Sequence, residues 1–207
     1  MQAAITALGV LGAVNGSILK LGRAIGIVAV ALMVVAILIQ VFFRYVLNNA
    51  LPWPDEAARF CMMWMTGLMA PSAFRAGGFV AIDMVVAALP RMVGAFISLG
   101  LLFISALVLY TAVQIGLKEV SGIGGKFGSA ALYVPFAPLG ICDGSLGLKV
   151  TGDTSWCRVP RSWMMLSLLV GVILLLWVNI ELILRAIVGL LGHGDELPPI
   201  ANAEVAD

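Results

Sequence analysis

The fold is decided by the stretch FRYVLNNALPWPDEAARFCMMWMTGLMAPSAFRAGGFVAID, residues 43–83, in which an apolar segment is closed at both ends by charges. Residues 57–74 form that segment, and as a helix with a rise of 1.5 Å per residue they would span about 27 Å. This length is close to the hydrocarbon thickness of a bilayer, roughly 30 Å. The stretch therefore predicts a transmembrane helix with a charged collar at each end.

The first collar combines two acids with one arginine. Asp55 and Glu56 follow Pro54, so they fall in the first helical turn, where acids favour the positive end of the helix dipole. Arg59 lies four residues after Asp55 and three after Glu56, so both carboxylates can reach its guanidinium. Trp53 suits the membrane interface through its amphipathic ring. The pattern predicts an ion cluster at this outer collar.

The second collar is formed by Arg75 and Asp83, which are eight residues apart. That separation is about 12 Å along a helix, so direct pairing requires a turn between them. Gly77 and Gly78 can supply the turn. We expect this pair to hold the connector of residues 75–91 against the bundle or against a partner.

The composition excludes an ordinary soluble domain. The chain has 207 residues, of which 62% are hydrophobic and 11% charged, and its mean hydropathy is +1.09. The formal net charge is +1 without a basic stripe, so nucleic acid is not an expected partner. The bilayer is the expected environment of this chain.

Three further segments are long and apolar enough to cross a bilayer. Together with residues 57–74, the predicted spans are residues 25–43, 92–116 and 162–187. We therefore predict an all-α, polytopic membrane protein with four transmembrane helices in one membrane domain, residues 1–192. An external loop, residues 118–161, would join the last two spans, and a polar tail, residues 193–207, would be disordered.

Additional helices are expected at the membrane interface. Residues 5–18 favour an interfacial helix, with a frayed apolar end as the alternative, and the 75–91 connector has a one-sided apolar face. Residues 130–141 are apolar but too short to span, so they are expected to be interfacial or re-entrant. The G-x-x-x-G pattern Gly22–Gly26 is interpreted as chance, because so short a pattern is common.

The last predicted span contains an acid, Glu181, followed one turn later by Arg185. An ionisable residue inside a membrane span is by default a candidate functional residue. Its i,i+4 arginine and its position near the span's end favour a structural ion pair instead.

Two cysteines, Cys142 and Cys157, bracket a polar, glycine-rich segment of the external loop. We predict a disulfide between them, which would suit an oxidising compartment. Two unrelated free thiols remain the alternative. Cys61 differs because it lies inside a predicted span.

The ordered set of residues from Arg44 to Pro90 resembles the small membrane subunit of the tripartite ATP-independent periplasmic (TRAP) transporters, the DctQ-like family. The matching positions are Arg44, Tyr45, Trp53, Glu56, Arg59, Arg75, Gly77, Val80, Asp83, Leu89 and Pro90. Two positions depart from the family pattern: Phe79 stands where histidine is usual, and Pro54 where a small polar cap is usual. The close match covers about 50 residues, and the four-helix layout matches loosely.

The resemblance implies partners and a site of action. The family works with a large membrane subunit, which holds the substrate and sodium sites, and with a periplasmic binding protein that delivers an organic acid. It implies an inner-membrane protein with both termini in the cytoplasm; the loop charges alone do not decide the orientation. By these arguments the expected structural and partner-interface residues are Arg44, Trp53, Asp55, Glu56, Arg59, Arg75, Gly77, Asp83, Glu181 and Arg185.

Other functions find little support in the residues. The chain offers no Ser/His/Asp set and no metal-ligand cluster, so neither catalysis nor a metal or cofactor is expected. A haem-binding membrane anchor would need axial histidine ligands, but the single histidine, His193, lies outside the predicted spans. The spans also lack the polar chains and broken helices of an ion-coupled transport site. A scaffolding subunit of a transporter is the favoured function, and a generic structural or assembly membrane protein is the alternative.

Overall fold

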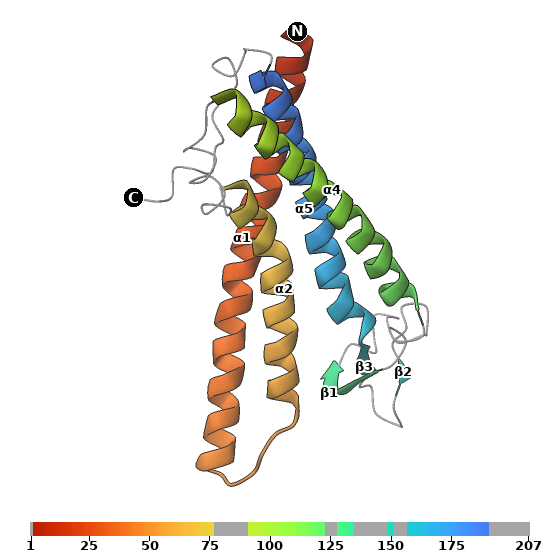
Figure 1. The fold of residues 1–207 in the computed structure, drawn as a ribbon. Helices are drawn as coiled ribbons and strands as arrows, with labels where there is room; N and C mark the ends of the chain where they lie inside the picture. The colour runs from red at the N-terminus through yellow and green to blue at the C-terminus, as the bar shows by residue number, and fades with distance from the viewer. Residues whose placement is uncertain (1, 77–90, 123–127, 135–148, 151–156, 191–207) are drawn as a thin grey trace. The chain divides into compact units, whose positions relative to one another are not determined.

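The computed structural model describes residues 2–76, 91–122, 128–134, 149–150 and 157–190. Helices dominate this part of the chain, as predicted (Figure 1). The four helices are α1 (Gln2–Tyr45), α2 (Trp53–Arg75), α4 (Arg91–Ser121) and α5 (Ser162–Val188). Three short strands, which were not predicted, lie between α4 and α5: β1 (Gly128–Val134), β2 (Lys149–Val150) and β3 (Cys157–Pro160).

Helix α1 is one continuous helix of 44 residues, so residues 5–18 are helical, as predicted, but they continue directly into the first predicted span instead of forming a helix apart from it. No proline interrupts the segment that joins this stretch to the first predicted span. The glycines at Gly16 and Gly22 each lower helix stability by only about 1 kcal/mol, which packing readily offsets. The second predicted interfacial helix, in the 75–91 connector, lies largely outside the described residues.

Three of the described helices are long and apolar enough to cross a membrane, in the ranges Leu8–Tyr45, Val93–Ser121 and Ser162–Val188. Helix α2 forms where the second span was predicted, but it is not among them. The reason lies in its sequence: Arg59, Trp64, Thr66 and Pro71 dilute its apolar character. The four-span prediction is therefore supported for three helices, and α2 is a helix of sufficient length but lower hydropathy.

The chain divides into two compact units, the first made of residues 1–24, 68–113 and 171–207. In this unit the inward face of α1 follows a regular 4-3-4-3 spacing. The buried positions on that face are Leu8, Gly12, Asn15, Leu19 and Gly22. A Cβ added at Gly22 would lie 3.2 Å from the carbonyl oxygen of Leu68 on α2. Gly22 is thus a site of close helix packing, a role that our interpretation of the Gly22–Gly26 pattern as chance did not give it.

The second unit contains residues 25–67 and 114–170. Helices α2 and α5 approach closely at Gly67, because a Cβ there would collide with the carbonyl oxygen of Ser167. The strands form an antiparallel sheet in the order β1-β3-β2, and Tyr133 pairs with Arg158 in its register. Residues 130–141, expected to be interfacial or re-entrant, therefore begin inside strand β1.

Candidate functional site

The centre of the first unit is the carboxylate of Glu181 on α5, which is fully buried. Its Oε1 accepts hydrogen bonds from Arg75 Nη2 at 2.8 Å and from Arg185 Nε at 3.1 Å. Its Oε2 accepts a hydrogen bond from Asn15 Nδ2 at 2.5 Å. These contacts join α1, α2 and α5 through one side chain. We call Asn15, Arg75, Glu181 and Arg185 the buried ion cluster.

Glycine on α1 makes room for this cluster. A Cβ added at Gly12 would lie 2.8 Å from Arg185 Nη2 and 3.2 Å from Glu181 Oε1. The Gly12 carbonyl oxygen accepts a second hydrogen bond from Arg75 Nη2, at 2.9 Å. The bare backbone of α1 therefore serves both as a surface against which the charged groups pack and as an acceptor for the arginine.

The buried ion cluster carries one more positive than negative formal charge, because two arginines share one carboxylate. The Arg75 side chain is only 1% exposed, yet its Nε and Nη1 have no hydrogen-bond partner among the described residues. Unsatisfied buried donors reduce stability. The cluster therefore holds three helices together but leaves donor capacity unused at Arg75.

This unused capacity predicts a stabilising substitution at Gly16. The Cβ of a new residue there would lie 3.6 Å from Arg75 Nη1, an ordinary contact distance. Gly16→Ser would bring a hydroxyl acceptor near that nitrogen, and we expect it to stabilise the chain by about 1–2 kcal/mol through the hydrogen bond and better helix propensity. Thermal unfolding of the purified protein measures this. Gly16→Ala is the control, because it gains propensity without an acceptor; equal effects of the two variants would show that Arg75 gains no bond.

Two further polar contacts lie in the same unit. Arg23 Nη2 on α1 donates to Ser72 Oγ on α2 at 3.1 Å. Asn179, fully buried on α5, donates through Nδ2 to Ser105 Oγ at 2.9 Å and to the Leu102 carbonyl oxygen at 3.2 Å on α4. Polar side chains therefore connect α5 to α4 as well as to α1 and α2.

The chemistry available to the buried ion cluster is structural. Both carboxylate oxygens of Glu181 are already engaged by arginine and asparagine donors. Within the described residues, no group of three or more His, Cys, Asp or Glu side chains could hold a metal ion. A buried, fully bonded carboxylate fixes helices in place rather than binding a mobile ligand.

The structure brings together three of the residues singled out from the sequence: Arg75, Glu181 and Arg185. Glu181 and Arg185 form an ion pair one helical turn apart, and Arg75 joins them from another helix. Asp83, the predicted partner of Arg75, lies outside the described residues, as does Gly77. Within the described chain, the carboxylate bound to Arg75 is that of Glu181.

The ion cluster predicted for the outer collar stays a prediction, and Glu56, one of its two acids, is half-buried and has an interaction partner. Asp55 and Arg59 are exposed at the start of α2, and among the described residues no ion pair joins these two side chains. Exposed pairs gain little free energy in high dielectric, so their side chains need not meet. Trp53 is 40% exposed, and the Arg44 guanidinium lies 5.8 Å from the centre of the Tyr45 ring.

The predicted disulfide involves one residue outside the described chain. Cys157 lies in β3, opposite Val134 of β1 and Val150 of β2 in the sheet register. Cys142 is not among the described residues, so the bond stays a prediction. Cys61, inside α2, is a free cysteine.

Sequence reasoning missed the contribution of α1 to the cluster, namely Gly12 and Asn15. A signal for it exists, since Asn15 is a lone amide in an apolar stretch and Gly12 and Gly16 have the small-x-x-x-small spacing of close helix contacts. The α4 partners of Asn179 could not be read from the sequence, because that contact depends on which helices pack together.

The fold and the site define a helical membrane protein whose described polar centre ties helices together rather than performing catalysis. A family profile described as "Tripartite ATP-independent periplasmic transporters, DctQ component" matches residues 33–142, just over half of the chain. The chain belongs to this family, the small membrane component of TRAP transporters, and the resemblance noted in the sequence is confirmed. The family is a transporter component and not an enzyme family.

No curated protein and no solved structure matches this chain significantly.

Proposed function

We propose that this chain is the small membrane subunit that scaffolds the large transport subunit of a TRAP-type secondary transporter. Uptake of an organic acid, delivered by a periplasmic binding protein, would be driven by an ion gradient. The observation that carries the proposal is the DctQ match over residues 33–142. The buried ion cluster supports a scaffolding role, because its one carboxylate is occupied by the chain's own donors and is not available to a transported ion.

The proposal places the protein in the bacterial inner membrane with both termini in the cytoplasm. The resemblance supports this placement, as does the cysteine pair of the α4–α5 connector, which would then face the oxidising periplasm. The exposed residues at the α1–α2 turn, Arg44, Trp53, Asp55 and Arg59, are available to contact partner subunits. Glu56, Gly77 and Asp83 are proposed for the same interface on the strength of the resemblance.

Co-expression with the large subunit tests the scaffolding proposal. The tagged large subunit should retain this chain through detergent purification. Reconstituted vesicles should take up the binding protein's radiolabelled ligand only when both membrane subunits, the loaded binding protein and an ion gradient are present. A large subunit that assembles and transports equally well without this chain would instead favour a generic structural or assembly protein.

Thiol labelling tests the predicted disulfide between Cys142 and Cys157. In intact cells, neither cysteine should react with an impermeant maleimide until a reductant is added, and both should react afterwards. Cys61, inside α2, should stay unlabelled in both states, which makes it the internal reference. Full labelling without reductant would show that the bond is absent, and no labelling after reduction would contradict the external location of the connector.

A further inference from the structure

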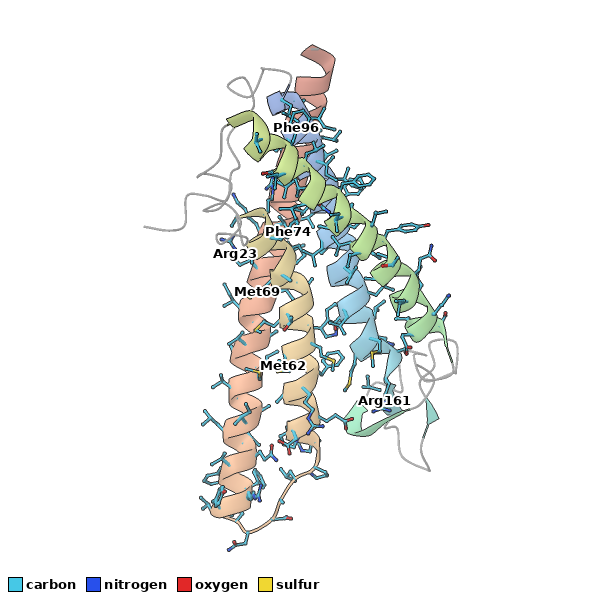
Figure 2. The ribbon with its side chains drawn as sticks, in the orientation of Figure 1. Arg23, Met62, Met69, Phe74, Phe96 and Arg161 are labelled. Carbon is cyan, nitrogen blue, oxygen red and sulfur yellow. The ribbon has the colours of Figure 1, made fainter. Side chains whose placement is uncertain are left out.

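Lys20 and Arg23 are two cations one helical turn apart on α1, and among the described residues neither has a carboxylate partner. The ion pairs of Glu181 are formed with Arg75 and Arg185, and neither Lys20 nor Arg23 takes part in them. The polar contact of Arg23 is with a neutral group, Ser72 Oγ, to which its Nη2 donates at 3.1 Å; Figure 2 labels Arg23. Lys20 is exposed and Arg23 is half-buried. The pair thus presents uncompensated positive charge beside α2.

The length of α1 places this pair at a defined depth. Between Arg23 and Arg44 the helix contains 20 residues without a charge. At 1.5 Å per residue they extend about 30 Å, which equals the thickness of the hydrocarbon layer. When these residues cross the bilayer, Arg23 lies at the level of the lipid headgroups. Lys20, three residues nearer the N-terminus of the helix, lies about 4–5 Å farther than Arg23 from the hydrocarbon layer.

The surrounding unit adds to the positive charge. In the described residues of the first unit, lysine and arginine outnumber acids five to one. The single acid, Glu181, is already shared by two arginines inside the buried ion cluster. An anion bound at Lys20 and Arg23 must therefore come from outside this part of the chain.

We propose that Lys20 and Arg23 bind the phosphate of an anionic phospholipid headgroup. Arginine is suited to this because its planar guanidinium can donate two parallel hydrogen bonds to phosphate oxygens. Lysine one turn away supplies a second charge within reach of the same phosphate. The bond to Ser72 uses one nitrogen of Arg23 and leaves the others available to the lipid.

Ser72 is the positioning residue of this site. It is buried, only 7% exposed, and it fixes the Arg23 guanidinium against α2 without neutralising its charge. A fixed guanidinium loses less rotamer freedom when the lipid binds. Removing the Ser72 hydroxyl should therefore weaken lipid binding although no charge changes, which distinguishes a formed site from general attraction to a negative surface.

Lipid binding to the full-length chain in detergent, measured by native mass spectrometry, tests the proposal. The wild type should retain phosphatidylglycerol in preference to phosphatidylcholine, and high salt should reduce the preference. Each juxtamembrane cation contributes a factor of roughly five, so the double variant Lys20→Gln/Arg23→Gln should lose about 25-fold in phosphatidylglycerol affinity. Ser72→Ala should bind phosphatidylglycerol several-fold more weakly than the wild type. Arg23→Lys should retain most of the charge-dependent affinity.

The matched control is Lys118→Gln/Arg161→Gln, which removes the same net charge from one exposed lysine and one exposed arginine elsewhere. This variant should keep the lipid preference. An equal loss in the control, or a preference that survives the Lys20/Arg23 substitutions, would overturn the site. Two further outcomes would show that the ligand is not a lipid. One is displacement of the lipid by millimolar inorganic phosphate alone. The other is an acidic partner protein that binds without lipid and depends on Arg23 for binding. Each variant is first checked for a single size-exclusion peak. Ser72→Ala keeps the test decisive when the double variant does not fold, because unchanged phosphatidylglycerol affinity in Ser72→Ala would also overturn the site.

Discussion

Replacing Glu181 by glutamine is expected to destabilise the chain by about 3–5 kcal/mol. The change keeps the size and shape of the side chain but removes the carboxylate to which Arg75 and Arg185 donate in the buried ion cluster. Arg75 is 1% exposed, so its charge cannot be transferred to water without separating α1, α2 and α5. Thermal unfolding followed by fluorescence, on the purified protein in one detergent, measures the loss.

The matched control is Glu119→Gln, which removes an exposed carboxylate from α4 and should change stability by less than about 0.5 kcal/mol. A second comparison isolates the charge from the packing. The double variant Arg75→Met/Glu181→Leu removes the buried pair altogether and should recover much of the stability lost in Glu181→Gln, because apolar residues of similar volume often replace a buried ion pair without loss. Arg185 can then extend to the surface, since it is already 12% exposed. A Glu181→Gln protein as stable as the wild type would contradict the role given to the cluster.

The same network shows which parts of the site could be predicted from the sequence. Helix geometry alone places Glu181 beside Arg185, because residues four apart share a face. The contact between Arg75 and Glu181 joins residues 106 positions apart, and the one between Asn15 and Glu181 joins residues 166 apart. Such contacts depend on which helices pack together, and no local pattern specifies that.

The family resemblance could not supply these contacts either. The DctQ match covers residues 33–142 and therefore includes Arg75, but it excludes Gly12, Asn15, Glu181 and Arg185. The buried polar contacts of the described residues thus connect the matched segment to two helical segments outside it. Through Arg75, Glu181 and Asn15 connect the segment that matches the family profile to the N-terminal and C-terminal helices, which the profile does not match.

In the fold, the length of an apolar segment was enough to predict that a helix forms there. It was not enough to predict where the helix begins and ends. Helix α1 continues through Gly22 because its glycines pack against α2, and the gain from close packing exceeds their propensity cost. The three-stranded sheet was missed because its pairing is not local. Strand β3 pairs with β1, more than 20 residues earlier in the chain, and the apolar run of residues 130–141, which overlaps β1, was interpreted through its length.

The close approach of α2 and α5 at Gly67 gives the second large effect: Gly67→Ala is expected to destabilise the chain by about 3 kcal/mol, the upper end of the usual range for overpacking. The added Cβ would collide with the backbone carbonyl oxygen of Ser167, and a backbone atom within a helix cannot move aside as a flexible side chain can. Helices α2 and α5 would have to separate at this point.

Gly100→Ala is the control, because a Cβ there meets nothing within 4 Å and alanine improves helix propensity. This variant should be neutral or stabilising by up to about 1 kcal/mol. Thermal unfolding of both variants measures the difference. Similar midpoints would mean that α2 and α5 do not depend on glycine for their close approach. A lower midpoint in Gly67→Ala alone would show that the absence of a side chain sets the distance between these helices.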